Sequence, residues 1–467
     1  MSTDAPLARA SVRLSPRTVA RYTIGSLGTG GYATLPGLVL TYFLTDNLGV
    51  AALAAGLIVT LAKIWDVVID PLIGAASDRQ LARTGSRRGF MVVGALTLPV
   101  FFALTFAVPP SLGPIAGSIC VLLAFVATAT SFSLFQVPYV ALPAELTESY
   151  DERTRLIGWR VVVLTAAILL FGAGGPALRT AGSDQVTGYL VMGIVSGVVI
   201  GVGLFVASRT ADAAAKATAQ TRATDGGGAR LAVGLREQYL SGFRALGRSI
   251  PFRALLGTFL LQALATGTML AAAQYVATWV LRSEDAVTFV FIALVGPALL
   301  ATPVWTAVAR RIGKERAFAI ASVMFAVAAT SITVAVWAPG PWIYGSVALA
   351  GVAYAALQSL PLAMLPDVIS YDERRNGAGQ AGSFTGIWTA GETVGFALGA
   401  TVVSLMLAAT GYVSRVAGAA TQQPDAAITG IVLSFSILPA AIMAASLLVL
   451  RRYRLRREDI EAPPHPR

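Results

Sequence analysis

Charged residues, cysteine and histidine are all scarce in this chain of 467 residues. Asp, Glu, Lys and Arg together make up 13%, against about 25% in typical soluble domains. The single cysteine, Cys120, cannot form an internal disulfide, and we interpret it as a packing residue. The only histidine, His465, leaves no histidine-based metal site, Cys–His pair or Ser–His–Asp triad. The sequence therefore predicts a protein that is not an enzyme and has no cofactor.

Long apolar runs take the place of these residues. Hydrophobic residues make up 55% of the chain, and its mean hydropathy is +0.70. Crossing the hydrocarbon core of a bilayer, about 30 Å thick, takes roughly 20 residues. Runs of that length predict an all-α membrane protein with twelve transmembrane helices. The predicted spans are 20–46, 51–76, 90–109, 114–142, 156–180, 186–208, 252–281, 285–309, 316–338, 341–366, 377–410 and 426–450.

The basic residues predict how the chain sits in the membrane. The formal net charge is +11, but Lys and Arg cluster beside the ends of spans and do not form the single stripe typical of a nucleic-acid binder. In loops on the side opposite to the termini, only Arg179, Arg282 and Arg415 occur. The positive-inside rule then places both termini in the cytoplasm. We expect a multi-pass protein of the cell inner (plasma) membrane that contacts the lipid bilayer and no nucleic acid.

An internal repeat indicates two pseudo-symmetric six-helix halves. FQVPYVALPAELTESYDER, residues 135–153, follows the fourth predicted span, and LQSLPLAMLPDVISYDER, residues 357–374, follows the tenth. Such repeats are typical of transporters that bind their solute between the halves, near the bilayer midplane. The predicted organisation is an N-terminal half, a cytoplasmic linker, a C-terminal half and a basic cytoplasmic tail, at 1–208, 209–251, 252–450 and 451–467.

The linker contains a stretch with one apolar helical face. Its apolar residues are accompanied by arginines, as in a helix that lies on the inner membrane surface. A flexible tether with transient helix is the alternative. The residues concerned are Leu235, Tyr239, Phe243 and Leu246, with Arg236, Arg244 and Arg248.

The second predicted span holds three ionisable residues, which are costly in hydrocarbon and so indicate function. Lys63, Asp66 and Asp70 lie at positions i, i+3 and i+7, on one face of a helix. Two carboxylates beside one ammonium suit a cation site, because carboxylates ligate sodium or exchange a proton. Lys63 is then the charge partner of the empty site. The alternative is a structural pair of Lys63 and Asp66 that locks helices together.

Arg160 and Glu392 are further charges within predicted spans. Arg160 either holds a solute hydroxyl or carboxylate, or neutralises an acid such as Asp66. Glu392 is either a second proton or cation site or part of a helix-packing surface rich in small residues. Trp388 either stacks on a sugar ring or packs within the bundle.

Charged clusters near span ends predict gates. Asp78 and Arg79 follow the second span, and Glu145 and Arg153 follow the fourth; Asp367 and Arg374 occupy the corresponding region of the second half. We expect these residues to form cytoplasmic salt bridges between the halves that hold an outward-open state and break when the inner side opens. Ordinary topology anchoring is the competing interpretation.

Several motifs together resemble the glycoside-pentoside-hexuronide:cation symporter family of the major facilitator superfamily. They are YFLTD from Tyr42, KIWDVVIDPLIGAASDR from Lys63, VPYVALPAELTESYDER from Val137 and YDERRNGAGQAGSF from Tyr371. The resemblance implies the major facilitator fold. It also implies that Asp66 and Asp70 coordinate the coupling sodium, lithium or proton, that the hydroxyl of Ser133 assists, and that Arg160 lies at the sugar site.

The solute site departs from the family pattern. Gly30 and Gln136 stand where the resemblance places sugar-binding aspartates, and Val140 stands where it places a tryptophan; Glu392 and Thr393 lie near the position of an expected lysine. The losses argue against galactosides, because a site for several hydroxyls needs polar groups aimed at them. The predicted solute-binding positions are Gly30, Gln136, Val140, Arg160, Trp388 and Glu392.

The resulting prediction is a monomeric Na⁺- or H⁺-coupled symporter for a sugar, glycoside or uronide. Its partners are a small-molecule solute and a coupling cation. Two alternatives are a cation-coupled carrier of lysophospholipid or another amphiphile, and a solute sensor on the same fold that transports nothing.

Overall fold

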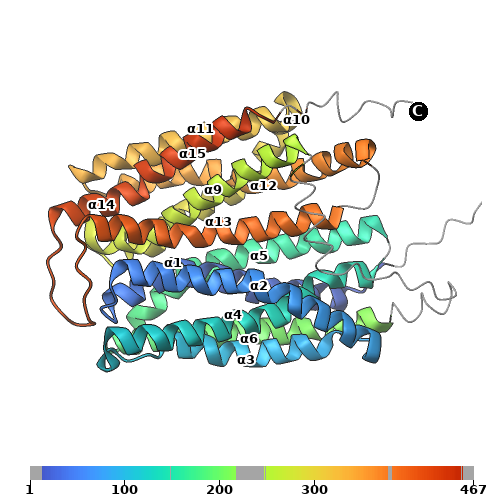
Figure 1. Cartoon of the computed structure of the whole chain (residues 1–467), viewed down its shortest axis with the longest axis horizontal. Coiled ribbons are helices and arrows are strands. Elements are labelled where there is room, and N and C mark those ends of the chain that lie inside the picture. The colour runs from blue at the N-terminus through green and yellow to red at the C-terminus, as the bar shows by residue number, and fades with distance from the viewer. Residues whose placement is uncertain are drawn as a thin grey trace, which may run out of the picture.

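The computed structural model describes residues 13–147, 149–216, 247, 249–376, 381–453 and 455. The predicted surface helix of the linker and almost all of the predicted tail lie outside these residues. The remaining chain forms two helical bundles that lie one above the other in Figure 1.

The first bundle contains six long helices. These are α1 Pro16–Asp46, α2 Ala52–Thr84, α3 Arg88–Phe106, α4 Gly113–Leu146, α5 Tyr150–Leu178 and α6 Gln185–Ser208, with short 3₁₀ turns at Pro110–Leu112 and Arg179–Ala181. The helical segment that contains α6 continues to Lys216.

The second bundle repeats this order with more breaks. It comprises α9 Ile250–Tyr275 with a π-helical turn at Val276–Val280, α10 Ala286–Ile312, α11 Lys314–Ser331 with a 3₁₀ turn at Ile332–Val336, α12 Ile343–Asn376, α13 Ala381–Ala409, α14 Asp425–Phe435 and α15 Ile437–Leu450.

The predicted all-α class is confirmed, and the count of twelve spans is supported. Within the described part of the chain, 11 helical segments are long and apolar enough to cross a membrane. The predicted first span coincides with α1, which is absent from those segments. Glycine and threonine lower its apolar character, and most of its residues are buried against other helices. The predicted last span is divided between α14 and α15 at Ser436.

Local sequence sets where several helices begin and end. Gly85 ends α2 by adopting a left-handed conformation, with φ +74°, that other residues avoid. Asp184 caps α6, because its Oδ1 accepts a hydrogen bond of 2.9 Å from the backbone N–H of Thr187. The hydrogen bonds from Thr187 lower the pKa of the Asp184 carboxyl.

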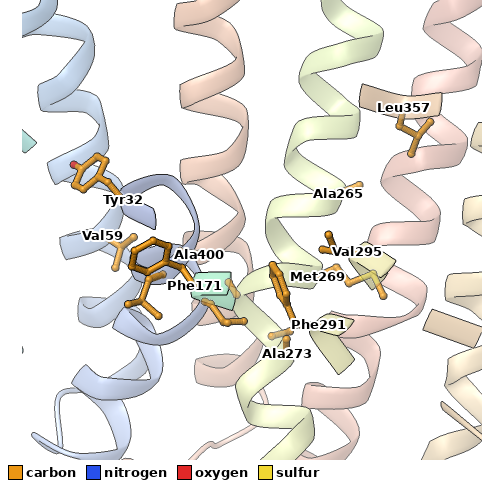
Figure 2. Packing of buried hydrophobic residues seen from close by; sticks show 14 of the residues in the cluster. Tyr32, Val59, Phe171, Ala265, Met269, Ala273, Phe291, Val295, Leu357 and Ala400 are labelled. Atoms are coloured by element: carbon orange, nitrogen blue, oxygen red, sulfur yellow. The ribbon is translucent and has the colours of Figure 1, made fainter. Parts of the chain in front are cut away.

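The two bundles meet mainly along three helix pairs, which are α2 with α13, α5 with α10 and α1 with α9. Gly56 lets α2 approach α13 closely, because a Cβ at this position would collide with Ser404. Figure 2 shows Val59 and Ala400 from the first pair, and Phe171 and Phe291 from the second.

We call the end of the molecule where α1 begins and α15 ends the terminal end. The opposite end, formed by the loops after α1, α5, α9 and α13, is the distal end. In Figure 1 the C-terminus lies at the right, and the loop between α13 and α14 lies at the left, at the distal end.

Candidate functional site

The three ionisable residues of α2 lie together as their spacing predicts. Lys63 Nζ is 3.3 Å from Asp66 Oδ2 and 4.2 Å from the centre of the Tyr32 ring. Asp66 is 7% exposed. One carboxylate oxygen of Asp66 and one of Asp70 are buried and have no hydrogen-bond partner among the described residues. Lys63 therefore satisfies only part of the acceptor capacity of the two acids.

Ser133 on α4 completes this group. Its side chain is 1% exposed, and its hydroxyl is close enough to the Asp70 carboxyl to interact with it. The structure thus brings together Asp66, Asp70 and Ser133, which come from α2 and α4. Unpartnered carboxylate oxygens beside a hydroxyl are the ligand chemistry that sodium prefers, and they equally suit an exchangeable proton. Their role in cation binding stays a prediction.

Arg160 on α5 lies against an aromatic surface. Its guanidinium carbon is 5.2 Å from the centre of the Tyr139 ring, and Tyr139 stacks on Tyr22 with ring centres 4.6 Å apart. The Tyr139 hydroxyl donates a hydrogen bond of 2.8 Å to the Tyr22 carbonyl. The Tyr22 hydroxyl and Arg160 Nε are both buried, and neither has a partner in hydrogen-bond geometry within the described part of the chain. We call Arg160, Tyr22 and Tyr139 the arginine cluster.

Sequence reasoning identified Arg160 but missed the two tyrosines. Neither tyrosine carries a charge, and although Tyr139 lies in the motif that begins at Val137, nothing in that motif pairs it with Arg160. Their proximity to Arg160 arises from packing between α1, α4 and α5, which the spacing of residues along one helix does not reveal.

The other predicted solute positions of the first bundle are scattered. Gln136 Oε1 is buried and unpartnered, whereas Val140 is 51% exposed. Gly30 faces α5, where a Cβ would lie 2.8 Å from the Cβ of Ala167. In this conformation Gly30 permits close packing of α1 on α5. The solute contacts of all three residues stay predictions.

In the second bundle, Trp388 and Glu392 lie on α13. Trp388 is 2% exposed and stacks on Phe259, with ring centres 4.3 Å apart. Glu392 interacts with Tyr354 but forms no ion pair or hydrogen bond with the described residues. The stack on Phe259 gives Trp388 a packing role in this conformation. Its contact with a sugar ring stays a prediction.

A small cavity between α9, α12 and α13 adds polar residues that sequence reasoning missed. Gln262, Thr266, Tyr354 and Gln358 are among its lining residues. Gln262 donates hydrogen bonds to Ser322 and Ser446 at 2.9 and 3.2 Å, while its Oε1 has no partner. Uncharged polar residues in apolar helices give a weak sequence signal, because most of them bond within the bundle.

At the terminal end, the predicted gating acids pair within their own half. Arg87 bonds both Asp78 and Glu145 at 2.6 Å, and Lys314 bonds Asp367 at 2.6 Å. The predicted gating arginines donate to nearby backbone carbonyls of the same half: Arg79 to Ala75, Arg153 to Thr147 and Arg374 to Ser370. The predicted salt bridges between the halves concern an outward-open state, and for that state they stay a prediction.

At the distal end, by contrast, a buried network joins the two halves. Asp46 accepts hydrogen bonds from Arg415 Nε at 3.0 Å and from the Tyr412 hydroxyl at 2.6 Å. Arg179 Nη2 donates to Gln274 Oε1 at 2.9 Å. Tyr42 contributes its hydroxyl, which accepts from Arg415 at 3.2 Å. We call this set the distal network.

Backbone hydrogen bonds reinforce the distal network. The N–H groups of Arg415 and Ala417 donate to the carbonyls of Thr45 and Asn47 at 2.9 and 3.0 Å, around a bridge between Leu48 and Val416. Asp46 and Arg415 are 369 positions apart in the sequence. No local spacing signal therefore predicts their contact.

Two helical bundles with charged groups buried in their membrane-spanning helices define a transporter of the major facilitator type. The chain matches the MFS/sugar transport protein family over residues 21–457, and it belongs to that family. This agrees with the symporter family that the sequence motifs resemble.

Named relatives extend this result. The chain is 24% identical to a putative sulfoquinovose importer of Escherichia coli, covering 96% of this chain and 92% of the relative. It is also 24% identical to the glucuronide carrier protein homolog of Escherichia coli, covering 95% and 93%. Among solved structures, a D-xylose-proton symporter superimposes with a TM-score of 0.68 at 15% identity, covering 95% of this chain and 98% of that one. This structural likeness shows the fold alone.

Proposed function

We propose that the protein is a cation-coupled symporter that moves a sugar, glycoside or uronide across the cell inner membrane. The observation that carries this proposal is the pair of unpartnered carboxylate oxygens on Asp66 and Asp70. In a membrane-spanning helix, such atoms are costly unless a cation or proton occupies the site. The relatives supply the solute class, since one is a putative sulfoquinovose importer and another a glucuronide carrier homolog.

The proposed coupling follows from charge. Lys63 balances one of the two carboxylates of α2, so the empty site keeps one excess negative charge. Bound Na⁺ or H⁺ removes that excess and the repulsion between Asp66 and Asp70. If the neutral site favours the conformation that also binds solute, each ligand raises the affinity for the other.

We further propose that the described conformation is closed on the outer side and that both termini are cytoplasmic. The distal network and its backbone bonds join the halves at one end, and the distribution of basic residues assigns the other end to the cytoplasm. Alternating access then requires the distal network to break while new contacts form at the terminal end.

The test uses purified protein in liposomes with an imposed Na⁺ or H⁺ gradient. Uptake of methyl glucuronide and methyl glucoside is measured for wild type, Asp66→Asn, Asp70→Asn and the control Asp184→Asn, which changes an exposed acid at the start of α6. We expect one of the two gradients to drive uptake in wild type. In both α2 variants, the rate of gradient-driven uptake should be at least tenfold lower. The control should retain it.

Other outcomes reject parts of the proposal. Equal uptake without either gradient would rule out coupling. Solute binding without flux in wild type would identify a sensor. Flux of lysophosphatidylcholine with no response to either glycoside would identify an amphiphile carrier.

A further inference from the structure

Arg160 carries a charge that the described structure does not compensate. It lies in the part of α5 that has membrane-spanning character, and it forms no ion pair with any acid in the described ranges. Its contact with the Tyr139 ring is favourable but leaves the positive charge in place. An unpaired charge in a membrane-spanning helix is unfavourable, so a partner that arrives later is expected.

Helices α1, α3, α4 and α6 supply no unpaired acid within their described residues. The only acids of α1 and α4 are Asp46 and Glu145. Asp46 already pairs with Arg415 at 3.0 Å, and Glu145 pairs with Arg87 at 2.6 Å. The described parts of α3 and α6 contain no acid between their first and last residues.

The α2 acids do not serve Arg160 either. Asp66 pairs with Lys63 at 3.3 Å, and Asp70 lies beside Ser133. Both belong to the proposed cation site, where the coupling ion uses the excess charge. Gly30 and Gln136, the positions where the family resemblance places aspartates, carry no charge.

The surroundings of Arg160 fit a bound anion. Tyr22 is 0% exposed, and its hydroxyl lies close enough to Arg160 to interact with it. Among the described residues, no group meets full hydrogen-bond geometry with this hydroxyl. A guanidinium with free N–H groups beside a phenol donor matches the planar oxygens of a carboxylate or the oxygens of a sulfonate. The Tyr22–Tyr139 stack provides an apolar surface beside them.

We infer that the solute is an anionic sugar whose carboxylate or sulfonate group binds Arg160 and the Tyr22 hydroxyl. This inference rests on the proposed sugar-transport function and narrows its solute class. A neutral glycoside would leave the charge of Arg160 uncompensated. An anionic one neutralises it, independently of the cation that neutralises Asp66 and Asp70.

The test compares sugars that differ at one carbon. Binding of methyl glucoside, methyl glucuronide and methyl 6-deoxy-6-sulfoglucoside to purified protein is measured by calorimetry in saturating Na⁺ at one pH. We expect at least one anionic sugar to bind tenfold or more tightly than the neutral one. The carboxylate and sulfonate arms show which acid group the cluster prefers.

Variants assign that preference to the arginine cluster. Arg160→Gln should bring the affinities of the three sugars within about threefold of each other, and Tyr22→Phe should reduce the preference by a smaller factor. Arg160→Lys should keep part of it, which separates charge from folding defects. The matched control is Arg155→Gln, five positions earlier on α5, where the arginine pairs with Glu152 at 2.8 Å; it should keep the full preference.

Two results overturn the inference alone: the neutral sugar binds as tightly as both anionic sugars, or the anion preference survives in Arg160→Gln. If none of the three sugars binds wild type, the proposed sugar function fails and the inference falls with it.

Discussion

The two ends of the molecule use charge differently. At the distal end, Asp46 of the first half bonds Arg415 and Tyr412 of the second. At the terminal end, Arg87 and Lys314 bond acids of their own half. Charges at the distal end therefore join the halves, whereas the described ion pairs at the terminal end stabilise loops and helix starts within each half.

This difference indicates which contacts a conformational change must break. Separating the halves at the distal end removes Asp46 from its partners, and a buried charge without a partner is unfavourable. Separating them at the terminal end leaves the described ion pairs of that end intact. The distal network should therefore dominate the preference for this conformation, and the following variants test that comparison, beginning with the largest expected effect.

Asp46→Asn should open the distal end. Loss of one partner of a buried pair costs about 3 to 5 kcal/mol, and about 3 kcal/mol shifts an equilibrium roughly a hundredfold. The readout is maleimide labelling of Ala273→Cys in a Cys120→Ser background. Ala273 is 4% exposed and adjoins Gln274, which bonds Arg179. Labelling should rise at least tenfold.

The control for this experiment is Asp184→Asn, which lies at the same end but outside the distal network. It should label at the wild-type rate, because asparagine also caps helices. Unchanged labelling in Asp46→Asn, with the variant still folded, would show that the distal network does not hold this end closed.

Arg87→Ala should lower stability without opening the distal end. The guanidinium bonds Asp78 and Glu145 at 2.6 Å each and also Ser77 at 2.8 Å. Hydrogen bonds to charged groups contribute about 1.5 to 3 kcal/mol, so thermal unfolding in detergent should begin at lower temperature. Labelling of Ala273→Cys should not change. An increase in labelling would mean that the terminal end also controls distal closure.

Thr60→Val tests the contact between α2 and α13 in the distal half of both helices. The Thr60 hydroxyl bonds the Thr401 hydroxyl at 2.6 Å and the Ala397 carbonyl at 3.0 Å. Valine keeps the shape and removes these bonds, at a cost of about 1 kcal/mol. Labelling of Ala273→Cys should rise severalfold, less than in Asp46→Asn. A rise in labelling equal to that of Asp46→Asn would show that the contact between α2 and α13 contributes as much to distal closure as the distal network.

The smallest effect concerns Glu152 at the terminal end. The hydrogen bond from Arg155 lowers the pKa of this carboxyl below its ordinary value. A carboxyl with a lowered pKa stabilises the folded state above its ordinary pKa of about 4.3, and this contribution is lost as the pH falls toward the lowered value. Wild type should therefore exceed Glu152→Gln in thermal stability at pH 7, and this difference should shrink as the pH falls below about 4.3. A constant difference across this range would contradict the charge interaction.

Sequence alone determined the fold more completely than the site. Hydrophobic length predicts the helices, and the repeat around Tyr150 and Tyr371 predicts two halves, because both are properties of contiguous residues. The same holds for Lys63 and Asp66, three positions apart on one helix. Tyr22 and Arg160 are brought together only by packing between helices, and so are Asp46 and Arg415.

The contact between α2 and α13 gives α2 the geometry of a lever. Thr60 lies at that contact, and at a rise of 1.5 Å per residue Asp66 and Asp70 lie about 9 and 15 Å further along the helix axis. A tilt of α2 about Thr60 therefore displaces Asp70 further than Asp66 relative to α4, which carries Ser133. Rocking of the two halves that tilts α2 within its own half would then change the spacing of Asp70 and Ser133, so that ion occupancy and the tilt of α2 are coupled.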